Sequence, residues 1–136
     1  MTRRLRLGMV GGGQGAFIGA VHRLAARMDD QYEFVAGALS ADAKKAKASG
    51  AELGLSPDRI YTDFHAMAKA EAKRADGIEV VSIVTPNHVH YEVARAFKKL
   101  IGHPRVVLSP DGEPVTVEED KLEMVAFAEQ GRIQLR

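Results

Sequence analysis

The chain has 136 residues, a formal net charge of +1 and a hydrophobic fraction of 46%, which is ordinary for a globular protein. It contains no cysteine, which excludes disulfide bonds and thiolate-bound zinc, and its near-neutral charge gives no support for nucleic acid as a partner. No apolar stretch approaches the ~20 residues of a membrane span, and the first residues lack the apolar core of a signal peptide. We therefore expect one soluble, cytoplasmic domain over residues 1–136.

The first predicted elements are a strand and a helix separated by a glycine cluster. Residues 4–10 alternate between charged and apolar side chains and then become apolar, as in a strand that enters a core. The glycine-rich stretch "GGGQG" follows at residues 11–15. Residues 16–28 predict a helix whose apolar stripe consists of Phe17, Ala20, Val21, Leu24 and Ala25.

The remaining elements continue the alternation of strands and helices. We predict strands over 32–39, 59–61, 78–85, 105–108 and 132–135, and helices over 42–53, from 62 or 63 to 74, from Asn87 to about 100, and from Thr116 onward. The strand over 78–85 is almost continuously apolar, which is typical of a central parallel strand. The last helix is predicted from the capping box Thr116-x-x-Glu119, with Leu122, Val125 and Ala126 on one face.

This order of elements predicts an α/β fold. Short alternating units favour right-handed crossovers and a doubly wound, mainly parallel, six-stranded Rossmann-type sheet in a three-layer αβα arrangement. Ligands of such sheets bind beyond the carboxyl ends of the strands. The glycine cluster and the segment Thr85-Pro86-Asn87 both follow strands, so we expect them to line one crevice.

The glycine cluster has the context of a dinucleotide-binding turn. A helix N-terminus offers unpaired N–H groups and a partial positive charge to a pyrophosphate. The best register is Gly11-x-Gly13-x-x-Ala16, in which Gly11 makes the turn, Gly13 admits the phosphate and Ala16 allows close packing of helix on strand. The alternative interpretation is a purely structural turn.

Two stretches resemble the N-terminal domain of the Gfo/Idh/MocA oxidoreductases, which act on sugars, inositols and related compounds. They are "GMVGGGQGAFIGAVHR" and "VSIVTPNHVHYEVARAF", and the similarity runs from about residue 4 to residue 100. The resemblance implies that these segments border the pyrophosphate and nicotinamide of a bound dinucleotide. The implied cofactor-binding residues are Gly11, Gly13, Gln14, Gly15, Ala16, Phe17, Ile18, Thr85, Pro86, Asn87 and His90.

The end of the second predicted strand bears on the choice between NAD and NADP. An acidic residue there normally binds the ribose hydroxyls of NAD, whereas this chain has Ser40. Ser40 together with Lys45 resembles the members of the family that use NADP, so the sequence favours NADP over NAD. Asp42 argues against a bound phosphate, and the alternative is that residues 41–48 form a solvated helix face capped by Asp42.

The sequence predicts no catalytic residue and no metal site. The family's catalytic lysine belongs to a Glu-Lys-Pro motif, whereas this chain reads Glu113-Pro114 without the lysine. The five histidines lack the spacing of a metal site or of a nucleophilic triad, and His90 acquires a role through the resemblance alone. We expect a dinucleotide-binding domain that does not catalyse hydride transfer by itself. The alternative is a non-enzymatic scaffold that serves structure, sensing or interaction.

Overall fold

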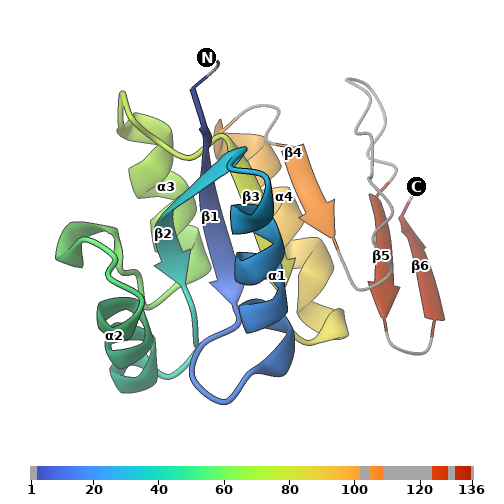
Figure 1. The fold of residues 1–136 in the computed structure, drawn as a ribbon. Helices are drawn as coiled ribbons and strands as arrows, with labels where there is room; N and C mark the ends of the chain where they lie inside the picture. Colours follow the sequence, from blue (N-terminus) through green and yellow to red (C-terminus); the bar gives the residue numbers. More distant parts are fainter. Residues whose placement is uncertain (1–2, 102–104, 109–123, 129–130, 136) are drawn as a thin grey trace.

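The computed structural model describes residues 3–101, 105–108, 124–128 and 131–135. Its central feature is a parallel sheet of four strands: β1 (Leu5–Gly11), β2 (Tyr32–Ala38), β3 (Val80–Val84) and β4 (Arg105–Leu108). Their order across the sheet is β2-β1-β3-β4, so the chain starts in the middle and extends to both sides (Figure 1). The prediction of an α/β Rossmann-type parallel sheet is confirmed.

The described residues form four α-helices around this sheet. They are α1 (Phe17–Met28), α2 (Ala43–Glu52), α3 (Phe64–Lys73) and α4 (His90–Ile101). Figure 1 shows α1 on one face, while α3 and α4 lie against each other on the opposite face. Because the strands are parallel, the loops that follow β1, β2 and β3 all lie at the carboxyl ends of the strands, on the same side of the sheet. In the described part of the chain, no helix is long and apolar enough to cross a membrane.

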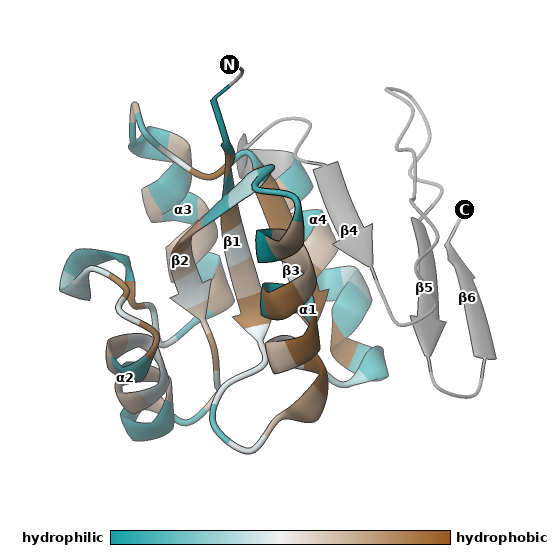
Figure 2. Ribbon diagram, viewed as in Figure 1, coloured by the Kyte–Doolittle hydropathy of each residue, from teal (hydrophilic) through white to brown (hydrophobic). Residues whose placement is uncertain are grey.

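The core has two parts, one on each face of the sheet. Val10 packs with Val93 and Phe97 in the cluster formed with α3 and α4. Met9, its neighbour in β1, packs on the other face with Leu39 and Leu55. This alternation follows from the two-residue period of a strand. Figure 2 shows the hydrophobic colouring concentrated on the central strands and on α1, whereas α2 is largely polar.

Helix α1 forms where it is predicted, but the predicted apolar stripe does not face the sheet. Phe17 is 82% exposed and Leu24 is 57% exposed. Gly19 is the buried residue of α1, and Ile18 and His22 on the same side are half-buried. The helix packs through the side that carries Ile18, Gly19 and His22, and its backbone closely approaches that of Gly12 at Gly19.

Two further predicted elements differ in the structure. Residues 57–59 form a 3₁₀-helix, η1 (Pro57–Arg59), and only Ile60 of the predicted strand 59–61 makes a bridge, to Gly37 of β2. Pro57 explains part of the difference, because proline suits the first turn of a helix and the 3₁₀ turn that it begins includes Arg59.

The C-terminal prediction is also corrected. Residues predicted to end a helix instead form β5 (Met124–Ala128), which pairs antiparallel with β6 (Gly131–Leu135). In the described residues these two strands form a separate sheet, so the predicted six-stranded sheet has four strands. A short apolar run such as "MVAFA" suits a strand or a helix equally, and periodicity cannot decide between them. The capping box at Thr116 and Glu119 lies outside the described residues.

Candidate functional site

The glycine-rich loop begins where β1 ends, at the carboxyl ends of the parallel strands. Gly11, Gly12 and Gly15 adopt φ angles of +83°, +74° and +80°, which side-chain-bearing residues rarely adopt. A Cβ atom at Gly11 would lie 2.7 Å from the carbonyl oxygen of Val84 and 3.0 Å from the backbone nitrogen of Thr85. The glycine loop and the segment after β3 are therefore in contact at Gly11, but Thr85, Pro86 and Asn87 are not among the residues that line the cavity described below.

The close approach of helix to strand occurs at Gly19 and not at Ala16. The backbone of Gly12 fills the space that a side chain at Gly19 would need, so both positions require glycine. Ala16 is exposed at the N-cap position of α1. The helix thus starts at the expected place, but its packing contact comes one turn later than the Gly11-x-Gly13-x-x-Ala16 register predicts.

The N-terminus of α1 has no side-chain cap within the described residues, unlike those of α2 and α3. Asp42 accepts a hydrogen bond from the backbone N–H of Lys45 at 2.7 Å, and Asp63 caps α3 in the same way. Ala16 has no side-chain oxygen that could cap α1. The N–H groups in the first turn of α1 are therefore available to an anion, and the partial positive charge of the helix end favours one.

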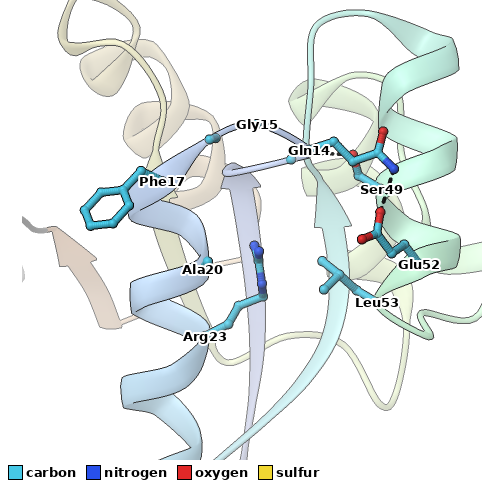
Figure 3. Close-up of a pocket in the computed structure, with 10 residues that line it drawn as sticks. Gln14, Gly15, Phe17, Ala20, Arg23, Ser49, Glu52 and Leu53 are labelled. Atoms are coloured by element: carbon cyan, nitrogen blue, oxygen red, sulfur yellow. Dashed lines mark hydrogen bonds between the residues drawn. The ribbon is translucent and has the colours of Figure 1, made fainter.

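A cavity of about 330 Å³ opens beside the glycine loop, between α1 and α2 (Figure 3). The loop crosses one end of this space, and Arg23 and Leu53 lie beneath it on opposite sides. Ten residues line the cavity: Gly13, Gln14, Gly15, Ala16, Phe17, Ala20, Arg23, Ser49, Glu52 and Leu53. Five of them, residues 13–17, are among the residues that the sequence predicts to bind a cofactor.

The middle of the loop is bonded to the segment that runs from β2 into α2. The N–H of Gly13 donates to the carbonyl oxygen of Leu39 at 3.0 Å. The N–H of Gln14 donates to Ser49 Oγ at 3.0 Å, and the Gln14 side-chain amide donates to Glu52 Oε2 at 2.5 Å. The amide protons of Gly13 and Gln14 are thus already used within the protein.

Arg23 supports the start of the loop from below. Its guanidinium donates to the carbonyl oxygen of Gly12 at 2.8 Å. Burial is the main factor that lowers the pKa of Arg23, Arg27 adds to the effect, and Glu52 opposes it. The side chain therefore combines a structural hydrogen bond with a positive charge at the wall of the cavity.

The segment after β3 is anchored by a buried histidine. His90 is 4% exposed, and its Nε2 donates to the carbonyl oxygen of Thr85 at 2.7 Å. Among the described residues, His90 Nδ1 and Thr85 Oγ1 are buried without a hydrogen-bond partner. Pro86 and Asn87 are exposed beside them, in the turn that leads into η2 (Asn87–Val89). The buried ring of His90 therefore holds the start of the Thr85-Pro86-Asn87 turn through its hydrogen bond to the Thr85 carbonyl oxygen.

The residues predicted to read the adenosine ribose lie at the start of α2, outside the cavity lining. Ser40 Oγ accepts a hydrogen bond from the backbone N–H of Asp42 at 3.2 Å, and Lys45 is exposed. Asp42 caps the helix, so its predicted capping role is confirmed. Ile18 is half-buried in the first turn of α1.

Five residues of the cavity lining were not predicted as site residues from the sequence: Ala20, Arg23, Ser49, Glu52 and Leu53. Arg23 lies three to four residues after Gly19 and Ala20, a spacing that places it on the same side of α1 as the loop. Ser49 and Glu52 are 35 and 38 residues from Gln14, and no local pattern signals such contacts. The described residues contain no group of three His, Cys, Asp or Glu side chains that could hold a metal ion.

A family model described as "Oxidoreductase family, NAD-binding Rossmann fold" matches residues 5–108. The chain belongs to the Gfo/Idh/MocA family. The matched region includes every predicted site residue and ends with β4. It therefore stops before Glu113-Pro114.

Individual proteins are also similar to this chain, which spans less than half of each of them. The uncharacterized oxidoreductase YfiI of Bacillus subtilis is 35% identical over 98% of this chain, which spans 40% of that protein. An oxidoreductase from Sinorhizobium meliloti is 62% identical with a TM-score of 0.71, over 77% of this chain and 28% of the other. An inositol dehydrogenase homologue from Azotobacter vinelandii, solved with NAD⁺, is 39% identical with a TM-score of 0.71, over 74% of this chain and 26% of the other.

Proposed function

We propose that this chain is a dinucleotide-binding unit of a Gfo/Idh/MocA oxidoreductase, with the cofactor pyrophosphate at the N-terminus of α1. The observation that carries the proposal is the uncapped start of α1 directly behind a loop with three positive-φ glycines. Gly13, Gln14 and Ala16 use their N–H groups within the protein. The pyrophosphate would be bound by the amides of Gly15, Phe17 and Ile18, for which the described residues supply no acceptor.

The nicotinamide end would extend toward the segment after β3. Gly11 lies against Val84 and Thr85, so a dinucleotide that crosses the loop reaches Thr85, Pro86 and Asn87 next. His90, whose ring is buried, would act by holding the Thr85 carbonyl in place. When bound, the nicotinamide accepts or donates a hydride, and this chain's residues bind and orient it.

The substrate class proposed for the whole protein is a sugar, an inositol or a related polyol. The homologue from Azotobacter vinelandii was also solved with NADH and myo-inositol. Because this chain spans 28% or less of these solved relatives, residues 1–136 are proposed to bind cofactor without carrying out turnover.

The second candidate, a non-enzymatic scaffold, is favoured by the absence of the catalytic lysine beside Pro114. Absence of saturable NADH or NADPH binding at millimolar concentration would favour this second candidate.

Gly15→Ala is expected to weaken NADH binding by about tenfold or more. No atom lies within 4 Å of the point where a Cβ at residue 15 would sit, so a methyl group would project into the space proposed for the pyrophosphate. Loss of one charge-assisted hydrogen bond is worth about 1.5–3 kcal/mol. NADH fluorescence titration of the purified chain measures the change.

Gly54→Ala is the matched control for this experiment. Gly54 also has a positive φ, +74°, and open space around a Cβ, but it lies beyond α2 and outside the cavity lining. Both variants should lose a similar amount of stability, about 1 kcal/mol, because both place a side chain in the left-handed region. Equal NADH affinity in the two variants would contradict the proposed pyrophosphate position.

We further propose that NADP binds more tightly than NAD and that Ser40→Asp reverses the order. Ser40 and Lys45 offer a hydroxyl and a cation to a 2′-phosphate, whereas an aspartate at residue 40 would repel it and accept from ribose hydroxyls. A charge-assisted contact is worth about 1.5–3 kcal/mol, so the preference should be about tenfold or more. Calorimetric titration with both cofactors tests this, and an NAD preference in the parent chain would assign Lys45 to the solvated face.

A further inference from the structure

The glycine loop is joined to α2 by two side chains that the fingerprint does not include. Ser49, which is 2% exposed, accepts from the backbone N–H of Gln14. Glu52 accepts from the side-chain amide of the same glutamine. Figure 3 shows Gln14 reaching from the loop across the mouth of the cavity to these two residues of α2.

Gln14 is well placed to control the shape of the loop. It lies between Gly13, whose N–H is bound to Leu39, and Gly15, whose φ of +80° turns the chain toward α1. Glycine-rich backbone has many accessible conformations, so a loop of this composition loses entropy when a ligand orders it. Contacts that order the loop in advance reduce this cost of binding.

We infer that Ser49 and Glu52 are positioning residues for the cofactor, because they hold the glycine loop through Gln14 in the shape that receives the pyrophosphate. This inference rests on the proposed dinucleotide site. According to this inference, the hydrogen bond from Gln14 to Glu52 increases the affinity for the cofactor, whereas the negative charge of Glu52 decreases it. A carboxylate near a pyrophosphate repels it, so removing the charge alone would strengthen binding. Removing the contact with Gln14 would weaken it.

A set of Glu52 variants separates these two effects. Glu52→Gln keeps an oxygen that accepts from Gln14 and removes the charge, so NADH affinity should equal or exceed that of the parent chain. Glu52→Ala removes both and should weaken NADH binding about three- to tenfold. Ser49→Ala should weaken it by a similar factor. Lys47→Ala, an exposed change on the same helix, is the control and should leave affinity unchanged.

Gln14→Ala and the double variant Gln14→Ala/Glu52→Ala complete the test. If Glu52 acts through Gln14, the double variant should bind NADH as weakly as either single variant and no more weakly. Additive losses, or tighter binding by Glu52→Ala than by the parent chain, would overturn the inference. Thermal melting of all variants checks that losses of affinity do not follow losses of stability.

Amide hydrogen exchange in the cofactor-free chain distinguishes failure of this inference from failure of the proposed function. Exchange at residues 13–16 should be faster in Glu52→Ala and Ser49→Ala than in the parent chain and in Lys47→Ala. Unchanged exchange would show that α2 does not hold the loop. A parent chain that exchanges slowly at the loop but binds no NADH would contradict the cofactor site itself, and with it the positioning role.

Discussion

Glu71→Ala is expected to lower the free energy of unfolding by about 3–5 kcal/mol, the typical effect of removing one partner from a buried ion pair. The Glu71 side chain is fully buried and accepts hydrogen bonds from Arg59 at 2.6 and 3.1 Å, from Tyr61 at 2.8 Å and from the N–H of Ile78 at 3.1 Å. Its removal leaves the buried Arg59 guanidinium without its main partner. Because small domains have total stabilities of about 5–15 kcal/mol, the loss should be evident in urea denaturation.

Two comparisons test the physical reason for this effect. Asp58→Ala removes the carboxylate of the exposed ion pair between Asp58 and Arg74, close to the C-terminal end of α3. This variant should have a urea midpoint close to that of the parent chain. The double variant Arg59→Met/Glu71→Leu removes both buried charges and should be more stable than Glu71→Ala. If Glu71→Ala were as mild as Asp58→Ala, the buried pair would contribute little to stability.

The Glu71 network also supports the candidate site from a distance. It connects α3 to η1 and to the backbone at Ile78, just before β3. The other end of β3 leads into Thr85 and the turn that His90 supports. Burial, together with the hydrogen bond to Glu71, raises the pKa of Tyr61 above its ordinary value, so this phenol stays a donor to the carboxylate.

The sequence predicts those elements whose signals are local. The apolar run of β3 and the Pro86-Asn87 break before α4 identify both elements, and Val93 and Phe97, which lie four residues apart in α4, are both buried. The glycine cluster identifies the loop after β1. Each of these signals depends on residues that are close together in the chain, so tertiary structure is not needed to interpret them.

The residues that the sequence does not predict depend on contacts between distant segments. Glu71 belongs to "AKAEAKRAD", which is typical of a solvated helix, and its burial becomes understandable only once Arg59 lies beside it. Ser49 and Glu52 likewise contact Gln14 only because α2 packs beside the loop. The apolar stripe of α1 is exposed because the helix packs through Gly19, whose close contact with the backbone of Gly12 involves residues outside that stripe.

Gly13→Val is expected to abolish NADH binding and also to lower the free energy of unfolding by about 1–3 kcal/mol, as overpacked substitutions do. The fingerprint register assigns the space at Gly13 to a phosphate, which predicts lost binding with an intact fold. In the structure this space is occupied by the protein, because a Cβ at Gly13 would lie 2.7 Å from the Leu39 carbonyl oxygen and 2.9 Å from Ser49 Oγ. The Leu39 carbonyl is backbone that already accepts from the Gly13 N–H, so it cannot move aside without breaking that bond.

Gly13→Ala provides a milder form of the same change and keeps the experiment informative if the valine variant does not fold. It should reduce both stability and NADH affinity, whereas Ser49→Ala in the Gly13→Ala background should recover part of the stability by removing the oxygen at 2.9 Å. Urea denaturation and NADH titration of the same preparations measure the two quantities. Parent-like stability with lost binding would instead show that the side chain of residue 13 faces the cofactor, as the fingerprint register predicts.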